Sequence, residues 1–366
     1  MKLTFVTGSL VHGGAERHTI TLANRLAERG HQCGFAYVRD DPSQLHRLLP
    51  AVGAQCLHAR RYLDFAALRR LAAILKEECP SAVIAANQYA LMYAALARAQ
   101  ARVAAPLLAT FHTTLLAGAK EWLQMLFYRP FFWRADCLAF VCDAQRRHWL
   151  RRLVAARSNR VIYNGVDPEH WRSPGPEIRE HIRRVLGLAP TDYVIAMCAV
   201  FRPEKNHLQL VEAVARLRSS GIAARALGIA ADVLVAGLQL DVRPFLAAAD
   251  AVALPSTSVE TFSLAALEAM ALGLPVVLSD IGGAADMVRP GAEGFLFPAG
   301  DTDALVERLA ALADPALRRR MGAAGRETVE ARFSERAMVD TYERLLQQLV
   351  QTRRQRANVR RSATAH

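Results

Sequence analysis

Short apolar runs alternate with longer amphipathic stretches along the first half of the chain. Six runs of β-branched and apolar residues lie at 3–7, 33–38, 82–86, 107–111, 137–142 and 161–163. Runs of this length predict buried strands, and the stretches between them predict helices. Because strands that alternate with helices form parallel sheets, the pattern predicts a doubly wound α/β domain.

A second series of the same kind follows, with apolar runs at 193–198, 232–236, 251–254 and 275–278. A chain of 366 residues exceeds what one hydrophobic core usually serves, so two domains are expected. We predict Rossmann-like domains at 1–168 and 191–333, a linker at 169–190, a final helix at 334–350 and a basic, disordered tail at 351–366. Two such domains facing each other imply an interdomain cleft, and ligands of open parallel sheets bind beyond the carboxyl ends of the strands.

The composition is that of a globular protein, with 52% apolar and 22% charged residues. No window reaches about 18 consecutive apolar residues and the first residues read as a strand, so we expect a cytoplasmic protein. Six cysteines without a Cys-x-x-Cys pair fit reduced, buried thiols. The net charge of +12 favours an acidic partner: nucleic acid, an anionic membrane face or a phosphorylated small molecule. Nucleic acid is the least favoured, because the basic residues match no nucleic-acid motif.

A glycine-rich loop follows the first predicted strand. Gly13 and Gly14 stand before a helix whose apolar face begins near Ile20. Paired glycines at a helix start let backbone N–H groups approach an anion closely, although a tight strand-to-helix turn has the same sequence. The full Gly-x-Gly-x-x-Gly pattern is absent, which argues against a nicotinamide-type dinucleotide fold.

Two basic residues follow the strand predicted at 193–198. Arg202 and Lys205 lie three residues apart, next to a helix predicted from Asn206. Fixed cations stabilise the negative charge that develops on a diphosphate leaving group, so the pair predicts diphosphate chemistry without a metal ion. The alternative is two solvated side chains in a polar loop.

The strongest local signal is a pair of carboxylates, Glu260 and Glu268, after the strand at 251–254. We place Glu260 just before a helix and Glu268 about two turns inside it, roughly 12 Å further along at 1.5 Å per residue, which is about the length of a folded nucleotide sugar. Free N–H groups at the helix start can hold a phosphate or a sugar hydroxyl between the carboxylates. The donor-binding segment would comprise Thr261, Phe262, Ser263 and Leu264. The alternatives are a dipole-complementing residue at 260 and a solvated residue at 268, but the helix is strongly apolar.

Three further features are open to two interpretations each. His112 ends the strand predicted at 107–111, where a catalytic and a structural histidine are equally well placed. Asp301 and Asp303 match the Asp-x-Asp motif of metal-dependent transferases, but Asp301 precedes a predicted helix and is interpreted as its N-cap. The aromatic and basic stretch at 122–133 is either a membrane-binding surface or part of the core.

Together these motifs resemble the retaining family 4 glycosyltransferases of GT-B fold. The resemblance spans nearly the whole chain, from the loop at 13–16 through the Asn-Gly-Val-Asp hinge at 164–167 to the Gly-Leu-Pro-Val-Val segment at 273–277. It implies a nucleoside-diphosphate sugar donor whose diphosphate contacts Gly14, Arg202 and Lys205. It further implies that Glu268 binds the ribose, that Glu260 contacts the donor sugar and that His112 lies beside the reacting carbon.

The resemblance also implies the course of the reaction. The anomeric configuration is retained, and neither a metal ion nor a cofactor takes part. The acceptor is a glycan or a lipid-linked molecule, as in bacterial lipopolysaccharide or exopolysaccharide synthesis. The basic helix predicted around Arg146, Arg147, Arg151 and Arg152 and the basic tail suit contact with the inner, anionic face of a membrane.

One segment departs from the family pattern. Members carry a further strand, a Gly-x-Gly-Pro turn and a further helix after the first helix of the second domain. Here the helix that ends near Arg218 leads through 221–224 into 225–228, which resembles the end of that further helix. The second domain is therefore expected to lack one βα unit and to fold more weakly, because the loss of a central strand exposes sheet edges.

Two other functions are weighed against glycosyl transfer. A sugar-nucleotide epimerase or hydrolase of GT-B type would need general acid or base carboxylates from both domains, and the sequence offers no such set. A catalytically silent module that binds a sugar nucleotide or an anionic membrane would use the basic helix and tail. The shortened second domain favours this second alternative.

Overall fold

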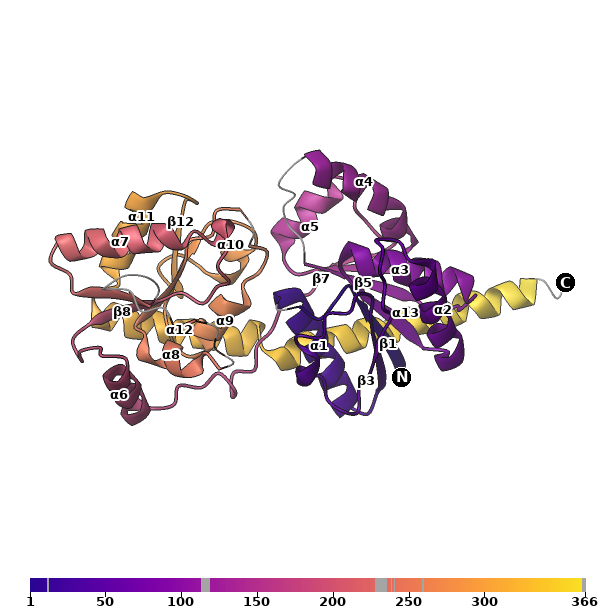
Figure 1. Ribbon diagram of the computed structural model, residues 1–366, viewed down its shortest axis with the longest axis horizontal. Helices are drawn as coiled ribbons and strands as arrows, with labels where there is room; N and C mark the ends of the chain where they lie inside the picture. Colours follow the sequence, from indigo (N-terminus) through magenta and orange to yellow (C-terminus); the bar gives the residue numbers. More distant parts are fainter. Residues whose placement is uncertain are drawn as a thin grey trace. The chain divides into compact units, whose positions relative to one another are not determined.

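The computed structural model describes residues 1–11, 13–112, 119–227, 236–237, 239, 241–258 and 260–363. The chain divides into two compact units, each with a parallel sheet of its own (Figure 1). Unit 1 comprises Met1–Ile162 and Met338–His366, and unit 2 comprises Tyr163–Ala337. The prediction of two Rossmann-like domains is therefore confirmed.

Unit 1 is built on a seven-stranded parallel sheet of order β3-β2-β1-β4-β5-β6-β7. Its strands are β1 (Lys2–Thr7), β2 (Gln32–Tyr37), β3 (Gly53–Cys56), β4 (Ala82–Ala86), β5 (Leu107–Phe111), β6 (Cys137–Phe140) and β7 (Asn159–Val161). The strand order reverses between β1 and β4. Ligands of doubly wound sheets bind at this switch point, so the loop after β1 has the position of a ligand-binding loop.

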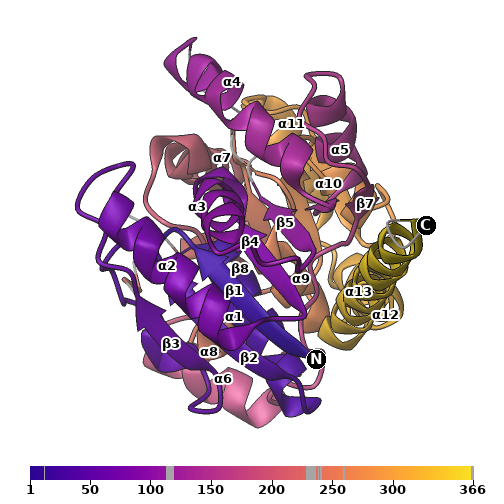
Figure 2. The ribbon, with the colours of Figure 1, turned by 90° about the vertical axis from the view of Figure 1, so that its right-hand side faces the viewer.

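Helices cover both faces of this sheet, as the two views in Figures 1 and 2 show. Val83 and Leu107 pack on the side of α2 to α5, whereas their neighbours Ile84 and Leu108 pack on the side of α1 and α13. This alternation is the period of two that a strand imposes. The helical elements are α1 (Gly14–Glu28), η1 (Leu45–Arg47), α2 (Phe65–Glu78), α3 (Asn87–Gln100), α4 (Ala119–Arg134), α5 (Asp143–Leu150) and α13 (Glu335–Ala363).

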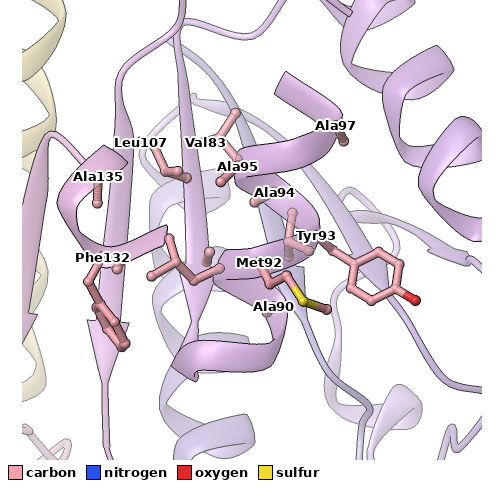
Figure 3. Packing of buried hydrophobic residues seen from close by; sticks show 14 of the residues in the cluster. Val83, Ala90, Met92, Tyr93, Ala94, Ala95, Ala97, Leu107, Phe132 and Ala135 are labelled. Carbon is pink, nitrogen blue, oxygen red and sulfur yellow. The ribbon is translucent and has the colours of Figure 1, made fainter. Parts of the chain in front are cut away.

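The core on the α3 side is shown in Figure 3. Small residues of α3, Ala90 and Ala94, let this helix lie close to the sheet, while the larger Tyr93 and Phe132 fill the space toward α2 and α4. All four are fully buried. Burial of a large aromatic side chain contributes about 2 to 3 kcal/mol, so this cluster fixes α3 beside β4 and β5.

Unit 2 is built on a five-stranded parallel sheet of order β12-β11-β10-β8-β9. Its strands are β8 (Tyr193–Ala196), β9 (Ala224–Leu227), β10 (Ala251–Leu254), β11 (Val276–Ser279) and β12 (Gly294–Phe297). Residues of α7 and α11 pack on the face formed by Ile195, Ala253 and Val277. The helical elements are α6 (Pro176–Val185), η2 (Pro203–Lys205), α7 (His207–Ser219), α8 (Arg243–Ala248), α9 (Leu264–Ala271), α10 (Ala284–Met287), α11 (Thr302–Ala311) and α12 (Pro315–Arg332).

The segment after α7 differs from its prediction. Residues 225–227 were expected to resemble a helix end, but they lie in β9, which pairs in parallel with β8. The helix cannot continue because Gly221 has a φ of 86°, in the left-handed region that ends helices. The loss of a βα unit is not confirmed, since a strand does follow α7. Most of the strand predicted at 232–236 lies outside the described residues.

The carboxy-terminal segment also differs from its prediction. The tail was expected to be disordered from residue 351, but α13 continues to Ala363. Its first half anchors it, because Tyr342 and Leu346 are fully buried in the core of unit 1. Arginine and glutamine, which have good helix propensity, then carry the helix onward. Residues from Met338 on therefore belong to unit 1 and not to a segment outside both domains.

Two chain segments of unit 2 are held together where the chain enters and leaves it. The Val166 N–H donates to Phe333 O at 3.0 Å, and the Glu335 N–H donates to Val166 O at 2.8 Å. A Cβ on Gly165 would lie 2.6 Å from the Ser334 oxygen and 2.8 Å from the Glu335 Cα. Glycine at this hinge position therefore permits a backbone contact that any other residue would block.

Another close backbone contact joins α12 to the end of α9. A Cβ on Gly322 would overlap the Gly273 carbonyl oxygen, whereas a Cβ on Gly325, in the same helix, would contact only Met270 at 3.5 Å. We expect Gly322→Ala to destabilise unit 2 by about 1 to 3 kcal/mol through overpacking. Gly325→Ala is the matched control and should be neutral or stabilising by up to about 1 kcal/mol, since alanine favours helix. Urea unfolding followed by circular dichroism tests this; equal effects of the two substitutions would contradict the packing described.

Candidate functional site

The basic pair predicted for diphosphate binding follows β8 in unit 2. Arg202 is the N-cap residue of the short helix η2, and Lys205 is its last residue. Asn206 then takes a left-handed φ of 54° and turns the chain into α7. This turn fixes both cations near the carboxyl end of the sheet, as predicted. Arg202 is exposed, and in the part of the chain that the structure describes no acidic side chain pairs with it.

Lys205 pairs with Glu260, the first of the two predicted carboxylates. The Lys205 Nζ lies 2.6 Å from Glu260 Oε2, and the two side chains are 18% and 23% exposed. The Ser256 hydroxyl lies 3.4 Å from the same oxygen. Half-buried ion pairs of this kind are held more firmly than surface pairs, because solvent screens them less. The structure thus brings together two site residues that are far apart in the sequence.

Backbone contacts fix the loop that carries Glu260. The Thr261 carbonyl accepts from the Gly283 N–H at 2.8 Å, and the Phe262 carbonyl accepts from Asn164 Nδ2 at 3.0 Å. Gly282 has a φ of 59° and would bring a Cβ into the Glu260 backbone oxygen. A side chain at 282 is therefore excluded, and the loop after β10 is held in one conformation.

The helix that follows begins later than predicted. Its N-cap is Ser263, whose hydroxyl accepts from the Ala266 N–H at 3.3 Å, and α9 starts at Leu264. The N–H group of Phe262 therefore precedes the helix start, whereas those of the N-cap Ser263 and of Leu264 belong to it. Glu268 lies about one turn inside α9, not two. Its side chain is only 4% exposed, in agreement with the apolar character of the helix.

A small cavity lies beside this loop. It is lined by Ser256, Glu260, Thr261, Phe262, Ser263 and Ser279, together with apolar side chains of β10, β11 and α10. Its volume of about 10 Å³ is about what one water molecule needs. A nucleotide sugar does not fit in it, so a donor bound to these residues would lie along the open carboxyl edge of the sheet.

In unit 1, the glycine pair stands at the start of α1. Gly13 is the N-cap and Gly14 the first helical residue. The Glu16 carboxylate folds back against Gly13, where a Cβ would overlap Oε2. Burial raises the pKa of Glu16. The Glu16 carboxylate thus lies beside the helix-start N–H groups that were predicted to approach a donor diphosphate. A phosphate that binds there would have to displace this carboxylate or share the N–H groups with it.

His112 follows β5 and belongs to a buried aromatic cluster. Its backbone N–H donates to Asn87 Oδ1 at 2.9 Å, and this hydrogen bond orients the end of the strand. The ring lies 4.7 Å from that of His18 in α1, and the His18 ring lies 5.5 Å from that of Tyr342 in α13. Burial lowers the pKa of His112 to about 4, and burial and the neighbouring His112 lower that of His18 well below its usual value. Both imidazoles are therefore neutral at pH 7.

His18 was not predicted as a site residue from the sequence. Its side chain is 3% exposed, and neither ring nitrogen has a hydrogen-bond partner among the described residues. A buried polar group without a partner costs about 1 to 3 kcal/mol, so this histidine lowers stability where it stands. The sequence signal for His18 is its position on the apolar face of a predicted helix, next to Thr19 and one turn after Ala15.

One group of described residues has the make-up of a metal site. Asp40 after β2, Cys56 at the end of β3 and His58 after it offer three ligand atoms within 4.8 Å of one another. The His58 Nδ1 and Asp40 Oδ2 are 3.1 Å apart, and the two side chains are 61% and 58% exposed. None of the three was predicted as a site residue. The expectation of a metal-free reaction stays a prediction.

The two discounted features have clear positions. Asp301 is the N-cap of α11 and accepts from the Ala304 N–H at 2.9 Å, as predicted. The stretch at 122–133 forms most of α4. One face of this helix packs in the core through Met125, Tyr128 and Phe132. The other face exposes the apolar side chains of Leu123, Leu126, Phe127 and Trp133. No helix among the described residues is long and apolar enough to cross a membrane.

Two protein families match the chain. Residues 12–170 match the family described as Glycosyltransferase Family 4, and residues 222–328 match the family described as Glycosyl transferases group 1. The first match falls mainly on unit 1 and the second on unit 2.

Several curated relatives carry glycosyl-transfer names. A GDP-mannose-dependent monoacylated alpha-(1-6)-phosphatidylinositol monomannoside mannosyltransferase of Corynebacterium glutamicum is 30% identical over 263 residues, which are 64% of this chain and 66% of that protein. N-acetyl-alpha-D-glucosaminyl L-malate synthase of Bacillus anthracis is 24% identical over 90% of this chain and 93% of its own. The lipopolysaccharide core biosynthesis glycosyltransferase LpsE of Rhizobium meliloti is 34% identical over 43% of this chain and 51% of its own. The chain thus covers less than two thirds of the first and third of these relatives.

Solved structures share the fold over nearly the whole chain. HepE of Anabaena, in complex with UDP and glucose, has a TM-score of 0.83 at 22% identity and covers 95% of this chain and 100% of its own. Sucrose-phosphate synthase of Thermosynechococcus elongatus has a TM-score of 0.78 at 22% identity and covers 96% and 100%. With both family matches and the two parallel sheets in agreement, the chain belongs to glycosyltransferase family 4 and has the GT-B fold.

Proposed function

We propose that this protein is a retaining, metal-independent glycosyltransferase that moves a sugar from a nucleoside-diphosphate sugar to a glycan or lipid-linked acceptor. The Lys205–Glu260 pair at the carboxyl end of the unit 2 sheet carries this proposal. It is supported by the structure of HepE with UDP and glucose and by a relative named for GDP-mannose. The nucleotide is therefore sought among UDP and GDP.

In the proposed mechanism, charge on unit 2 replaces a metal ion. Arg202 has no acidic partner among the described residues, so its guanidinium is available to a diphosphate. Lys205 is oriented by Glu260 and stabilises the charge that develops on the leaving diphosphate. Glu260 contacts the donor sugar and Glu268 the ribose. Prearranged charge is effective because it needs no reorganisation during the reaction.

His112 has the proposed position beside the reacting carbon. A neutral imidazole can accept a hydrogen bond from a sugar hydroxyl without adding a positive charge next to a carbon that becomes cationic. The low pKa of His112, caused by burial, keeps it in this form at pH 7. The arrangement therefore favours an oxocarbenium-like transition state, with retention by attack on the face that the diphosphate leaves.

The acceptor is proposed to be an envelope glycan or its lipid-linked precursor at the cytoplasmic face of a membrane. Relatives named for a phosphatidylinositol mannoside and for lipopolysaccharide core synthesis support this choice. The exposed apolar side chains of α4, among them Phe127 and Trp133, and the basic residues of α13 suit peripheral contact with such a membrane.

Donor binding is tested by a thermal-shift and calorimetric panel of UDP- and GDP-sugars. We expect Arg202→Ala and Glu268→Ala each to weaken binding of the preferred nucleotide by about tenfold or more, since a lost charge-assisted hydrogen bond costs about 1.5 to 3 kcal/mol. Arg184→Ala removes an exposed arginine from α6 and should leave binding unchanged. Equal affinities for all three variants would contradict the proposed donor site.

Catalysis is tested with Lys205→Met and with removal of metal ions. We expect Lys205→Met to lower kcat by about 10² to 10³, because it removes a charge that stabilises the transition state. Its stability should fall by about 1 to 3 kcal/mol, because the half-buried Glu260 carboxylate loses its partner, and the rate is therefore measured under conditions where the variant is folded. Excess EDTA should leave the rate of the unsubstituted enzyme unchanged. Loss of activity in EDTA would overturn the metal-free mechanism.

Because His18 and His112 are neutral in the folded state, we expect the free energy of unfolding to depend on pH. Because the folded pKa of His112 lies near 4 and the unfolded value near 6.5, the unfolded state binds more protons between these values. Unit 1 should therefore lose on the order of 3 kcal/mol as the pH falls from about 7 to 4. In His18→Phe the loss should be smaller, since one of the two imidazoles is gone. Urea unfolding from pH 7 to 5, with tryptophan fluorescence as the probe, measures this, since three of the four tryptophans lie in unit 1. Identical pH profiles would refute it.

A further inference from the structure

A second cavity, which is strongly basic, lies in unit 1 at the amino ends of the strands, opposite to the strand ends that carry His112. Its volume is about 210 Å³, and its lining includes Asp136, Arg157, Ser158, Arg160, Arg353 and Arg356. Asp136 precedes β6, Arg157 and Ser158 precede β7, and the last two arginines belong to α13. The cavity therefore lies at the amino ends of the strands. His112 follows the carboxyl end of β5, and five residues of strand separate the two edges by about 16 Å.

The one carboxylate of this lining is shared among several cations. Asp136 Oδ2 accepts from Arg98 at 3.0 Å and from the Leu107 N–H at 2.9 Å. The Asp136 Oδ1 lies 3.5 Å from Arg157 and 3.9 Å from Arg353. Asp136 is 11% exposed and Arg98 15%. A single negative charge thus faces three guanidinium groups, and it cannot neutralise them all.

The remaining arginines add to this excess. In the described part of the chain, neither Arg160 nor Arg356 pairs with an acidic side chain, and both are exposed where they line the cavity. Four arginines and one carboxylate give the lining a net charge of +3. Arg353 is held in place, because its Nε donates to the Ala104 carbonyl at 2.9 Å. Like charges at this density repel one another, and an anion between them would remove the repulsion.

We propose that this cavity binds a phosphate group, on a soluble phosphoester or on the headgroup of an anionic lipid. Guanidinium groups form bidentate hydrogen bonds with phosphate oxygens, and the hydroxyls of Ser158 and Thr352 in the lining add two further donors. The volume is below the 300 to 1,000 Å³ or so of pockets for drug-sized ligands, which suits a phosphate with a short substituent. The lining belongs to unit 1, whereas the predicted donor residues Arg202, Lys205, Glu260 and Glu268 belong to unit 2.

The experiment uses the full chain and two matched double variants. Arg160→Gln/Arg356→Gln removes the two lining arginines that have no acidic partner. Arg61→Gln/Arg69→Gln removes the same charge from exposed positions of unit 1 outside the lining and outside α13. Binding of inorganic phosphate and glycerol 3-phosphate is measured by calorimetry, and binding to vesicles by sedimentation with phosphatidylglycerol in phosphatidylcholine against phosphatidylcholine alone. Binding of UDP or GDP serves as a check that both variants are folded.

We expect the lining variant to bind its phosphate ligand at least tenfold more weakly, and the control variant to bind it as the unsubstituted chain does. Binding of glycerol 3-phosphate without vesicle binding identifies a soluble phosphoester. Sedimentation with phosphatidylglycerol vesicles that the lining variant alone loses identifies the lipid headgroup. The proposal is overturned if the unsubstituted chain binds none of these ligands, or if both double variants lose binding equally, which would mean that net charge alone is responsible.

Discussion

Both sheets of this protein are parallel and are covered by helices on both faces, and this burial decides where chemistry can occur. Residues of β4 and β5 are all buried, and polar side chains within them would have to be desolvated. Functional side chains are therefore confined to the strand ends. His112 directly follows β5, whereas Lys205 and Glu260 lie in the loops after β8 and β10. The location of the site is thus a consequence of how the core is built.

The same burial explains which strands the sequence predicts. Central strands such as β4, β5 and β10 are continuous apolar runs, and their predicted bounds match the observed ones. The edge strands β3 and β12 were not predicted. β3 is mostly exposed and includes Gly53, and β12 begins at Gly294, whose Cβ position overlaps the Val276 backbone. Their pairing is specified by neighbours far away in the chain, so a local pattern could not reveal them.

The residues of the candidate site stay a prediction from motifs, and their contacts could not be predicted from the sequence. The cations and carboxylates of unit 2 could be named from motifs, yet the Lys205–Glu260 pair joins residues 55 positions apart and requires the fold. The late start of α9 follows from the hydroxyl of Ser263, which competes with the acidic residue at 260 as the helix cap. His18 was missed because a histidine on an apolar helix face gives no sign of what it contacts. Its neighbours, His112 and Tyr342, come from the middle and the end of the chain.

The polarity of the βαβ fold gives the two edges of unit 1 different electrostatics. Helices run opposite to the strands, so their N-termini lie at the carboxyl edge and attract anions, while their C-termini lie at the amino edge and attract cations. Arg98, in the last turn of α3, shows this second effect, since it donates to the carbonyls of Ala105 and Arg134 and pairs with Asp136. The dipoles favour a cation such as Arg98 at this edge. They do not account for Arg160, which lies in a strand, or for Arg356, which lies in a helix that passes this edge and continues to Ala363. The helix dipoles therefore do not explain all of the positive charge at the amino edge, and this excess is what the proposed phosphate site would use.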